Sequence, residues 1–171
     1  SALMLALVFS AGCDLSTTMD YDQDVDFSAI KTYQWAGEKP SDVTDMAHKR
    51  LVGAIEDQLL LKGLNSVESD PDIYIVYYGD SDEQVVANTT NYGYGYGPGW
   101  YGGMGMGSST TTVSTFTVGT LVVDMFDAAK KELIWRGTVS GTVNDDPQKN
   151  IKLVQKAVEK LFKKYPPEKK S

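Results

Sequence analysis

The sequence predicts an α+β fold, a two-layer sandwich in which an antiparallel or mixed sheet of about five to six strands carries two helices on one face. One amphipathic helical segment precedes a run of consecutive strand-like segments, and a second one follows it. Because helices and strands do not alternate as in βαβ units, a purely parallel sheet is disfavoured. The length of 171 residues fits a single hydrophobic core.

The first half of the chain predicts two short strands followed by a helix. Residues 31–35 form one of the strands, with Tyr33 and Trp35 on the same face. Residues 41–45 offer helix caps, and Gly63 is a natural residue to end the helix. Between them, apolar residues recur at helical spacing at Ala47, Leu51, Ile55 and Leu59.

The second half predicts the rest of the sheet and a closing helix. The β-branched and aromatic segments 72–78, 110–117, 120–126 and 132–142 are each expected to be a strand. The short connection 127–131 predicts an antiparallel hairpin. Pro147 fits the first position of a helix capped by Asp145 or Asp146, and Pro166 and Pro167 end that helix. Its apolar face contains Ile151, Val154, Val158 and Leu161.

Composition and charge indicate one acidic, globular domain. With 42% hydrophobic and 23% charged residues, the chain has enough apolar material to fold. The formal net charge of −7 argues against nucleic acid as a partner, since that partner requires a clustered basic surface. We expect a single domain over residues 20–167, with a Gly/Tyr-rich insertion at 92–107 and a solvated tail at 168–171.

The N-terminal segment indicates export and lipidation. Residues 1–12 are uncharged and apolar up to small residues, as in a signal peptide that is truncated at its start. Ala11 and Gly12 before Cys13 resemble the lipobox of bacterial lipoproteins, although Ser10 stands where that motif prefers a branched apolar residue. This resemblance implies a lipid on Cys13, with residues 13–19 as a tether. The alternative is an ordinary cleaved signal peptide with an incidental cysteine.

The predicted anchor holds the domain at a membrane surface. Two or three acyl chains bind firmly, whereas one chain binds only marginally. After Cys13, no stretch approaches the ~20 apolar residues of a spanning helix. Asp14 resembles the retention signal of some inner-membrane lipoproteins, but this rule differs between lineages, so inner and outer membrane both stay open.

A run of acidic residues near the N-terminus is a candidate cation site. The acidic run contains Asp20, Asp22, Asp24 and Asp26. Counted from Asp20, it has Val25 and Lys31 where a calcium loop needs Gly and Glu, so we expect a solvated strand face, with weak divalent-cation binding as the alternative. No metal or other cofactor is expected.

The candidate catalytic residues are His48, Asp124 and Asp127. His48, the single histidine, has no accompanying G-x-S-x-G motif, so a structural or solvated role is expected. Asp124 and Asp127 form a conceivable carboxylate pair, but turn capping explains them more simply. Arg136 is expected to pair with one of them or to stack on an aromatic ring. No enzymatic activity is predicted.

The Gly/Tyr-rich segment (residues 92–107) contains a formal G-x-G-x-x-G match at 97–102. No helix start follows it, so a dinucleotide site is not predicted. Met104 and Met106 lack His or Cys co-ligands nearby for a soft metal such as Cu(I). The segment is expected to be an insertion between two strands. The aromatic residues that could contact a ligand are Tyr92, Tyr94, Tyr96, Trp100 and Tyr101.

The chain resembles the DUF4136 family of bacterial lipoproteins, a domain of unknown function. The matching residues are 20–35 (DYDQDVDFSAIKTYQW), 59–64 with 69–78, 120–141 (TLVVDMFDAAKKELIWRGTVSG) and the closing YPP at 165–167. The resemblance implies an envelope lipoprotein with an α+β fold, and it supplies no catalytic residues.

Three functional hypotheses follow. The leading one is a non-catalytic, periplasm-facing envelope lipoprotein, tethered to the membrane through Cys13, that acts as a structural or interaction module. The alternative is a ligand-binding module that contacts glycan, peptide or an envelope protein through the Gly/Tyr-rich segment. The third is a hydrolase that uses Asp124, Asp127 or His48.

Overall fold

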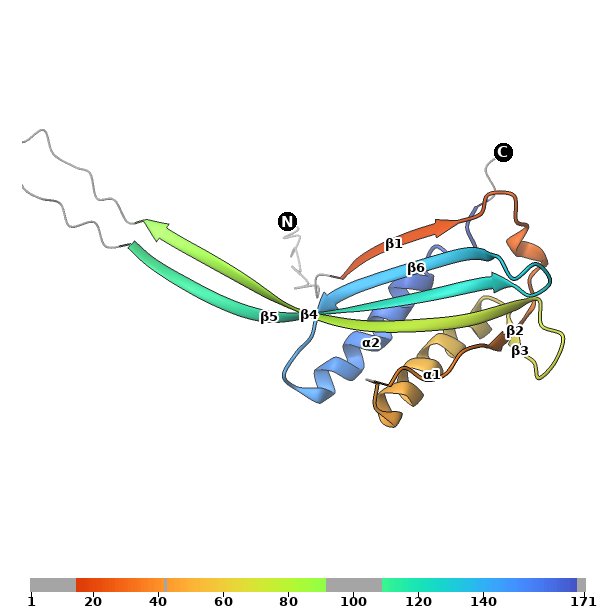
Figure 1. The fold of residues 1–171 in the computed structure, drawn as a ribbon, viewed down its shortest axis with the longest axis horizontal. Helices are drawn as coiled ribbons and strands as arrows, with labels where there is room; N and C mark the ends of the chain where they lie inside the picture. The colour runs from red at the N-terminus through yellow and green to blue at the C-terminus, as the bar shows by residue number, and fades with distance from the viewer. Residues whose placement is uncertain (1–14, 42, 92–108, 169–171) are drawn as a thin grey trace, which may run out of the picture.

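A computed structural model describes residues 15–41, 43–91 and 109–168. Within these residues, six strands form one sheet and two helices pack on one of its faces (Figure 1). The strands are β1 (Ser16–Tyr21), β2 (Thr32–Trp35), β3 (Asn65–Ser66), β4 (Ile73–Asn91), β5 (Ser109–Asp127) and β6 (Leu133–Thr142). The helices are α1 (Asp45–Leu61) and α2 (Pro147–Phe162), and a single 3-10 turn spans Phe27–Ala29.

The sheet is mixed, with the strand order β1-β6-β5-β4-β2-β3. The pairs β1/β6, β5/β6 and β4/β5 are antiparallel, whereas β2 pairs in parallel with both β3 and β4. The turn between β5 and β6 is closed by the Asp127 N–H, which donates to the carbonyl of Glu132 at 2.9 Å. The predicted α+β class and the predicted hairpin are therefore confirmed.

Both helices begin at residues whose side chains satisfy free backbone N–H groups. Thr44 Oγ1 accepts a hydrogen bond from the Ala47 N–H at 3.2 Å at the start of α1. At the start of α2, Asp146 accepts from the Gln148 N–H at 2.9 Å, and Pro147 follows it. Of the two caps that the sequence allowed, Asp146 is the one used.

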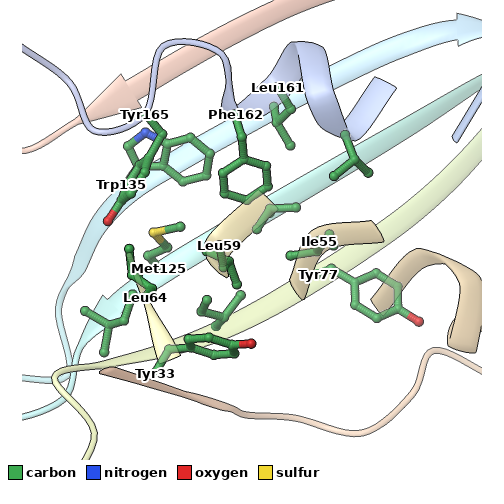
Figure 2. Packing of buried hydrophobic residues seen from close by; sticks show 14 of the residues in the cluster. Tyr33, Ile55, Leu59, Leu64, Tyr77, Met125, Trp135, Leu161, Phe162 and Tyr165 are labelled. Atoms are coloured by element: carbon green, nitrogen blue, oxygen red, sulfur yellow. The ribbon is translucent and has the colours of Figure 1, made fainter. Parts of the chain in front are cut away.

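The core lies between the helices and the sheet, as Figure 2 shows. Ile55 and Leu59 of α1 are fully buried, as are Val158 and Phe162 of α2. They pack against a row of sheet residues that includes Ile75, Tyr77, Val123, Met125 and Trp135. The Trp135 ring stacks on Phe162 and meets Tyr165 edge to face, with ring centroids 5.6 and 5.5 Å apart.

Three positions near this core matter for the predictions below. A Cβ atom at Gly137 would lie 2.4 Å from Trp135 Cη2, so the sheet needs glycine there. Burial raises the pKa of Tyr165 to about 12. The carboxylate of Asp72 accepts the backbone N–H groups of Lys31 and Thr32 at 2.8 and 2.9 Å, and the bond from Lys31 is the main reason its pKa is lowered.

The structure corrects four sequence predictions. Segments 110–117 and 120–126 are one continuous strand, β5, and β4 continues to Asn91 instead of ending near residue 78. The two-residue strand β3 was not predicted. The acidic run is a strand face only at Asp20, because the chain turns after β1 and the carboxylate of Asp22 accepts the Asp24 N–H at 2.9 Å.

Candidate functional site

The long β4–β5 hairpin extends well beyond the rest of the sheet (Figure 1). β6 pairs with β5 only as far as Val118, whereas the β4–β5 register continues from Glu83↔Thr117 to Asn91↔Ser109. We call residues 83–91 and 109–117 the hairpin arm. Its nine residue pairs correspond to a length of about 30 Å at the rise of an antiparallel strand.

The hairpin arm has open edges. In the part of the chain that the structure describes, β2 pairs with β4 only at residues 73–75, and no other strand pairs with the arm. Exposed strand edges are usually protected by Lys, Pro or a bulge. The arm contains one charged residue, Glu83, and neither Lys nor Pro. Its β-branched residues favour the extended conformation, so its backbone can pair with another strand.

All five predicted contact residues belong to the segment that joins the two strands of the arm. Tyr92, Tyr94, Tyr96, Trp100 and Tyr101, with Met104 and Met106, lie outside the described residues, as does Cys13. The structure nevertheless shows what precedes and follows that segment in the chain. Asn91 and Ser109 are directly paired, so the Gly/Tyr-rich segment connects two neighbouring strand ends.

The candidate catalytic residues lie apart in the fold. His48, on α1, is joined to the Tyr77 hydroxyl by a 2.7 Å hydrogen bond from its Nδ1 position, and the two rings stack. Tyr77 is directly opposite Val123, and both belong to the core beneath the helices. The neighbouring residue Asp124 therefore points to the opposite face of the sheet. The sheet separates this carboxylate from His48.

Asp124 is held in an ion pair instead. Arg136, directly opposite Asp124 on the neighbouring strand β6, donates from Nε and Nη2 to the two carboxylate oxygens at 2.7 and 2.6 Å. The side chain of Asp124 is 1% exposed and that of Arg136 is 50% exposed. Hydrogen bonding to Asp124 raises the pKa of Arg136 further. The predicted pairing of Arg136 with one of the two aspartates is confirmed.

Asp127 and Asp26 stabilise turns. Asp127 Oδ1 accepts the backbone N–H groups of Ala129 and Lys130 at 3.0 and 2.7 Å. Asp26 accepts from the Ser28 N–H at 3.1 Å at the start of the 3-10 turn. Within the described ranges, no three His, Cys, Asp or Glu side chains cluster so as to hold a metal ion.

An apolar groove that the sequence analysis did not identify lies between the two helices. Its volume is about 220 Å³. Part of α1 and Val43, two residues before it, form one wall, α2 forms the other, and β4, β5 and β6 form the floor. The lining residues are Leu15, Val43, Ala47, Leu51, Gly79, Gly119, Thr120, Leu121, Val139, Ser140, Gly141, Val143, Leu153, Val154 and Ala157.

Glycines make the floor of this groove. Gly119 and Gly141 are directly paired, and Gly79 is opposite Leu121, so all three lie on the helix-facing side of the sheet. A Cβ atom at Gly141 would lie 2.5 Å from Leu15 Cδ2. Leu15 therefore occupies space that glycine provides. Glycines inside strands were the sequence signal for this groove, because they often mark close approach of another group.

The start of the described chain is fixed at this groove. The Leu15 side chain is only 9% exposed, and Lys160 Nζ of α2 donates a hydrogen bond to the Leu15 carbonyl. Cys13 is two residues before Leu15 in the sequence. Neither described helix has both the length and the apolar character needed to cross a bilayer.

Comparison with solved structures identifies one protein with a similar fold and gives one weaker match. A crystal structure of a PDZ domain protein from Parabacteroides distasonis ATCC 8503 matches with a TM-score of 0.59 and 15% identity, over 92% of this chain and 36% of that one. This chain thus spans about a third of that protein's length. The PelC dodecamer from Paraburkholderia phytofirmans matches with a TM-score of 0.48 and 9% identity, over 86% and 94% of the two chains. The likeness to the PDZ domain protein concerns the fold alone.

Comparison with families is more informative than comparison with individual proteins. The curated protein sequences give no match. The family model described as "Domain of unknown function (DUF4136)" matches residues 17–167, which include every described strand and helix except the first residue of β1. The chain therefore belongs to the DUF4136 family.

Proposed function

We propose that this protein is a non-catalytic lipoprotein of the bacterial cell envelope that binds another protein through its hairpin arm. The observation that carries the proposal is the arm itself, with nine residue pairs beyond the sheet and open edges on its described strands. An isolated two-stranded ribbon is only marginally stable in water. A partner strand added to the arm would satisfy its free backbone groups and stabilise it.

The anchoring part of the proposal rests on the sequence around Cys13. Ala11 and Gly12 precede the cysteine, as in a lipobox, and they end the apolar segment of residues 1–12. A lipid on Cys13 would hold the domain at the periplasmic side of either membrane. The arm then gives the tethered domain a reach of about 30 Å toward its partner.

The absence of catalysis is part of the same proposal. His48 is engaged by Tyr77, and Asp124 is engaged by Arg136 on the opposite face of the sheet. Asp127 binds backbone N–H groups of its own turn. These groups do not converge on a shared substrate position, as a nucleophile and a general base must.

The test is crosslinking in intact cells, followed by purification and mass spectrometry. An armless variant carries Asn-Gly in place of residues 83–117, which joins the paired residues Asp82 and Val118 by a two-residue hairpin turn. We expect this variant to fold with little change in stability and to lose the crosslinked partner. If it retains the partner at the wild-type level, binding through the arm is wrong.

A sharper variant leaves the arm at full length. The double substitution T111K/T115K adds charge to one strand of the arm, and lysine on an edge strand disfavours strand addition. The matched control is Q148K/Q155K, which adds the same charge at exposed positions of α2. We expect the first variant to lose the partner and the control to keep it.

The same experiment tests the aromatic alternative. A variant in which Asn-Gly replaces residues 92–108 keeps both strands of the arm, because a two-residue turn then joins the paired residues Asn91 and Ser109. It removes the aromatic residues Tyr92, Tyr94, Tyr96, Trp100 and Tyr101. Retained crosslinking in this variant supports strand addition. Loss of crosslinking in this variant, with normal crosslinking by T111K/T115K, would assign binding to the aromatic rings, either to protein or, through stacking, to glycan.

A further inference from the structure

The apolar groove between α1 and α2 has too little volume for another helix but suits a single alkyl chain. Its volume of about 220 Å³ corresponds to about seven groups the size of a water molecule. An α-helix with its side chains is about 10–12 Å across. Apart from Thr120 and Ser140, the lining residues are aliphatic or glycine, so the groove favours a hydrocarbon over a polar ligand.

The path of the chain brings its predicted lipid to this groove. Leu15 lines the groove, and its backbone is held by Lys160. Two residues of extended chain span at most about 7 Å, so Cys13 cannot lie far from Leu15. A lipid attached to the cysteine thus starts close to the groove, and an acyl chain is longer than the gap.

We infer that the groove holds one acyl chain of the lipid attached to the protein's own Cys13. This inference rests on the lipid anchor of the proposed function and adds an intramolecular site to it. The occupied groove would fix the orientation of the domain relative to the bilayer, because one chain of the anchor is bound to protein while the others stay in the membrane. Sequestering one chain would also weaken the hold of the anchor on the membrane.

The test is photocrosslinking within the lipidated protein. Cells are grown with a diazirine analogue of palmitic acid, the protein is irradiated in its membrane, and its peptides are mapped by mass spectrometry. We expect the acyl chain to crosslink to α2 peptides that contain Leu153 and Val154, in a product that migrates as a monomer. Crosslinks only to bilayer lipid would overturn the inference.

Two groove variants and one control sharpen the result. Leu51→Glu places a charge in the groove, and Ala157→Phe fills it without adding charge. Leu60→Glu is the matched control on the same helix, because Leu60 is 64% exposed and does not line the groove. We expect crosslinking to α2 to fall at least about fivefold in both groove variants and to be unchanged in the control. Equal yields in all three, with each variant shown to fold by circular dichroism, would contradict the inference.

The design separates this inference from the anchor on which it rests. The intact mass of the wild-type protein reports whether Cys13 carries lipid. If it carries none, the proposed anchor fails and the groove inference fails with it. If lipid is present but the α2 crosslink is missing, only the groove inference fails. A crosslinked product of dimer size would assign the groove to a second copy of the chain and would also overturn the inference.

Discussion

Replacing Arg136 by Met is expected to destabilise the protein more than replacing Asp124 by Val, although each substitution breaks the same ion pair. The reason is the difference in exposure between the partners. The Asp124 side chain is 1% exposed, so without Arg136 it would be a buried carboxylate with no counter-charge. The Arg136 side chain is 50% exposed, so without Asp124 its guanidinium can still be hydrated.

The size of each effect follows from this geometry. Removing one partner of a fully buried pair costs about 3–5 kcal/mol, and water access from the Arg136 side lowers this to about 2–3 kcal/mol for Arg136→Met. For Asp124→Val we expect about 1 kcal/mol or less, since an exposed charge loses little and valine suits a strand. At about 2–4 °C per kcal/mol, Arg136→Met should lower the Tm by about 4–12 °C.

Urea unfolding followed by tryptophan fluorescence measures these differences. The slope of the free energy of unfolding against urea should be the same in all variants, so that midpoint shifts report stability. The double variant D124V/R136M should resemble Asp124→Val and not the sum of the two single variants. Equal losses from the two single variants, or a loss below about 0.5 kcal/mol for Arg136→Met, would refute the reasoning.

Three further predictions concern the core and its edges. Gly137→Ala should cost about 1–3 kcal/mol in urea unfolding, because the new methyl group would overlap the Trp135 ring; a neutral result would mean that the ring shifts freely. Because folding lowers the pKa of Asp72, its ionised carboxylate stabilises the fold at pH values above its ordinary pKa. This contribution is lost as the pH falls through the folded-state pKa. The stability lead of wild type over Asp72→Asn should therefore shrink between about pH 5 and pH 3, and a constant lead would contradict this. The raised pKa of Tyr165, about 12, should make wild type lose stability between about pH 10 and pH 12, and Tyr165→Phe should lose less. At neutral pH Tyr165→Phe should be within about 1 kcal/mol of wild type, since the buried hydroxyl has no hydrogen-bond partner in the described structure; a larger loss would show that the hydroxyl is bound.

Local patterns in the sequence were sufficient to predict the helices, because each helix buries a periodic apolar face. Ile55 and Leu59 of α1, with Val158 and Leu161 of α2, recur at helical spacing and are buried as predicted. The caps at both helix starts are also short-range signals. The pairing of Arg136 with an aspartate was predictable because both residues flank one hairpin turn.

The missed features depend on contacts between distant residues. The run after residue 78 is polar, so it does not resemble a strand. Gly119 interrupts an apolar pattern, so residues 110–126 do not resemble one continuous strand. Both segments belong to long strands, β4 and β5, because each residue pairs with one from the other strand across a 19-residue ladder. The groove was missed for a similar reason, since Gly79, Gly119 and Gly141 come together only through the register of three strands.

The hairpin arm also makes the pairing of the main sheet independent of the length of the connection between β4 and β5. Beyond Val118 the two strands of the arm pair only with each other among the described residues, so altering the connection between them leaves the pairing of the main sheet intact. Doubling the length of a flexible connection costs only about 0.6 kcal/mol in closure entropy. A longer or shorter connection between Asn91 and Ser109 should therefore change the stability of the packed sandwich little.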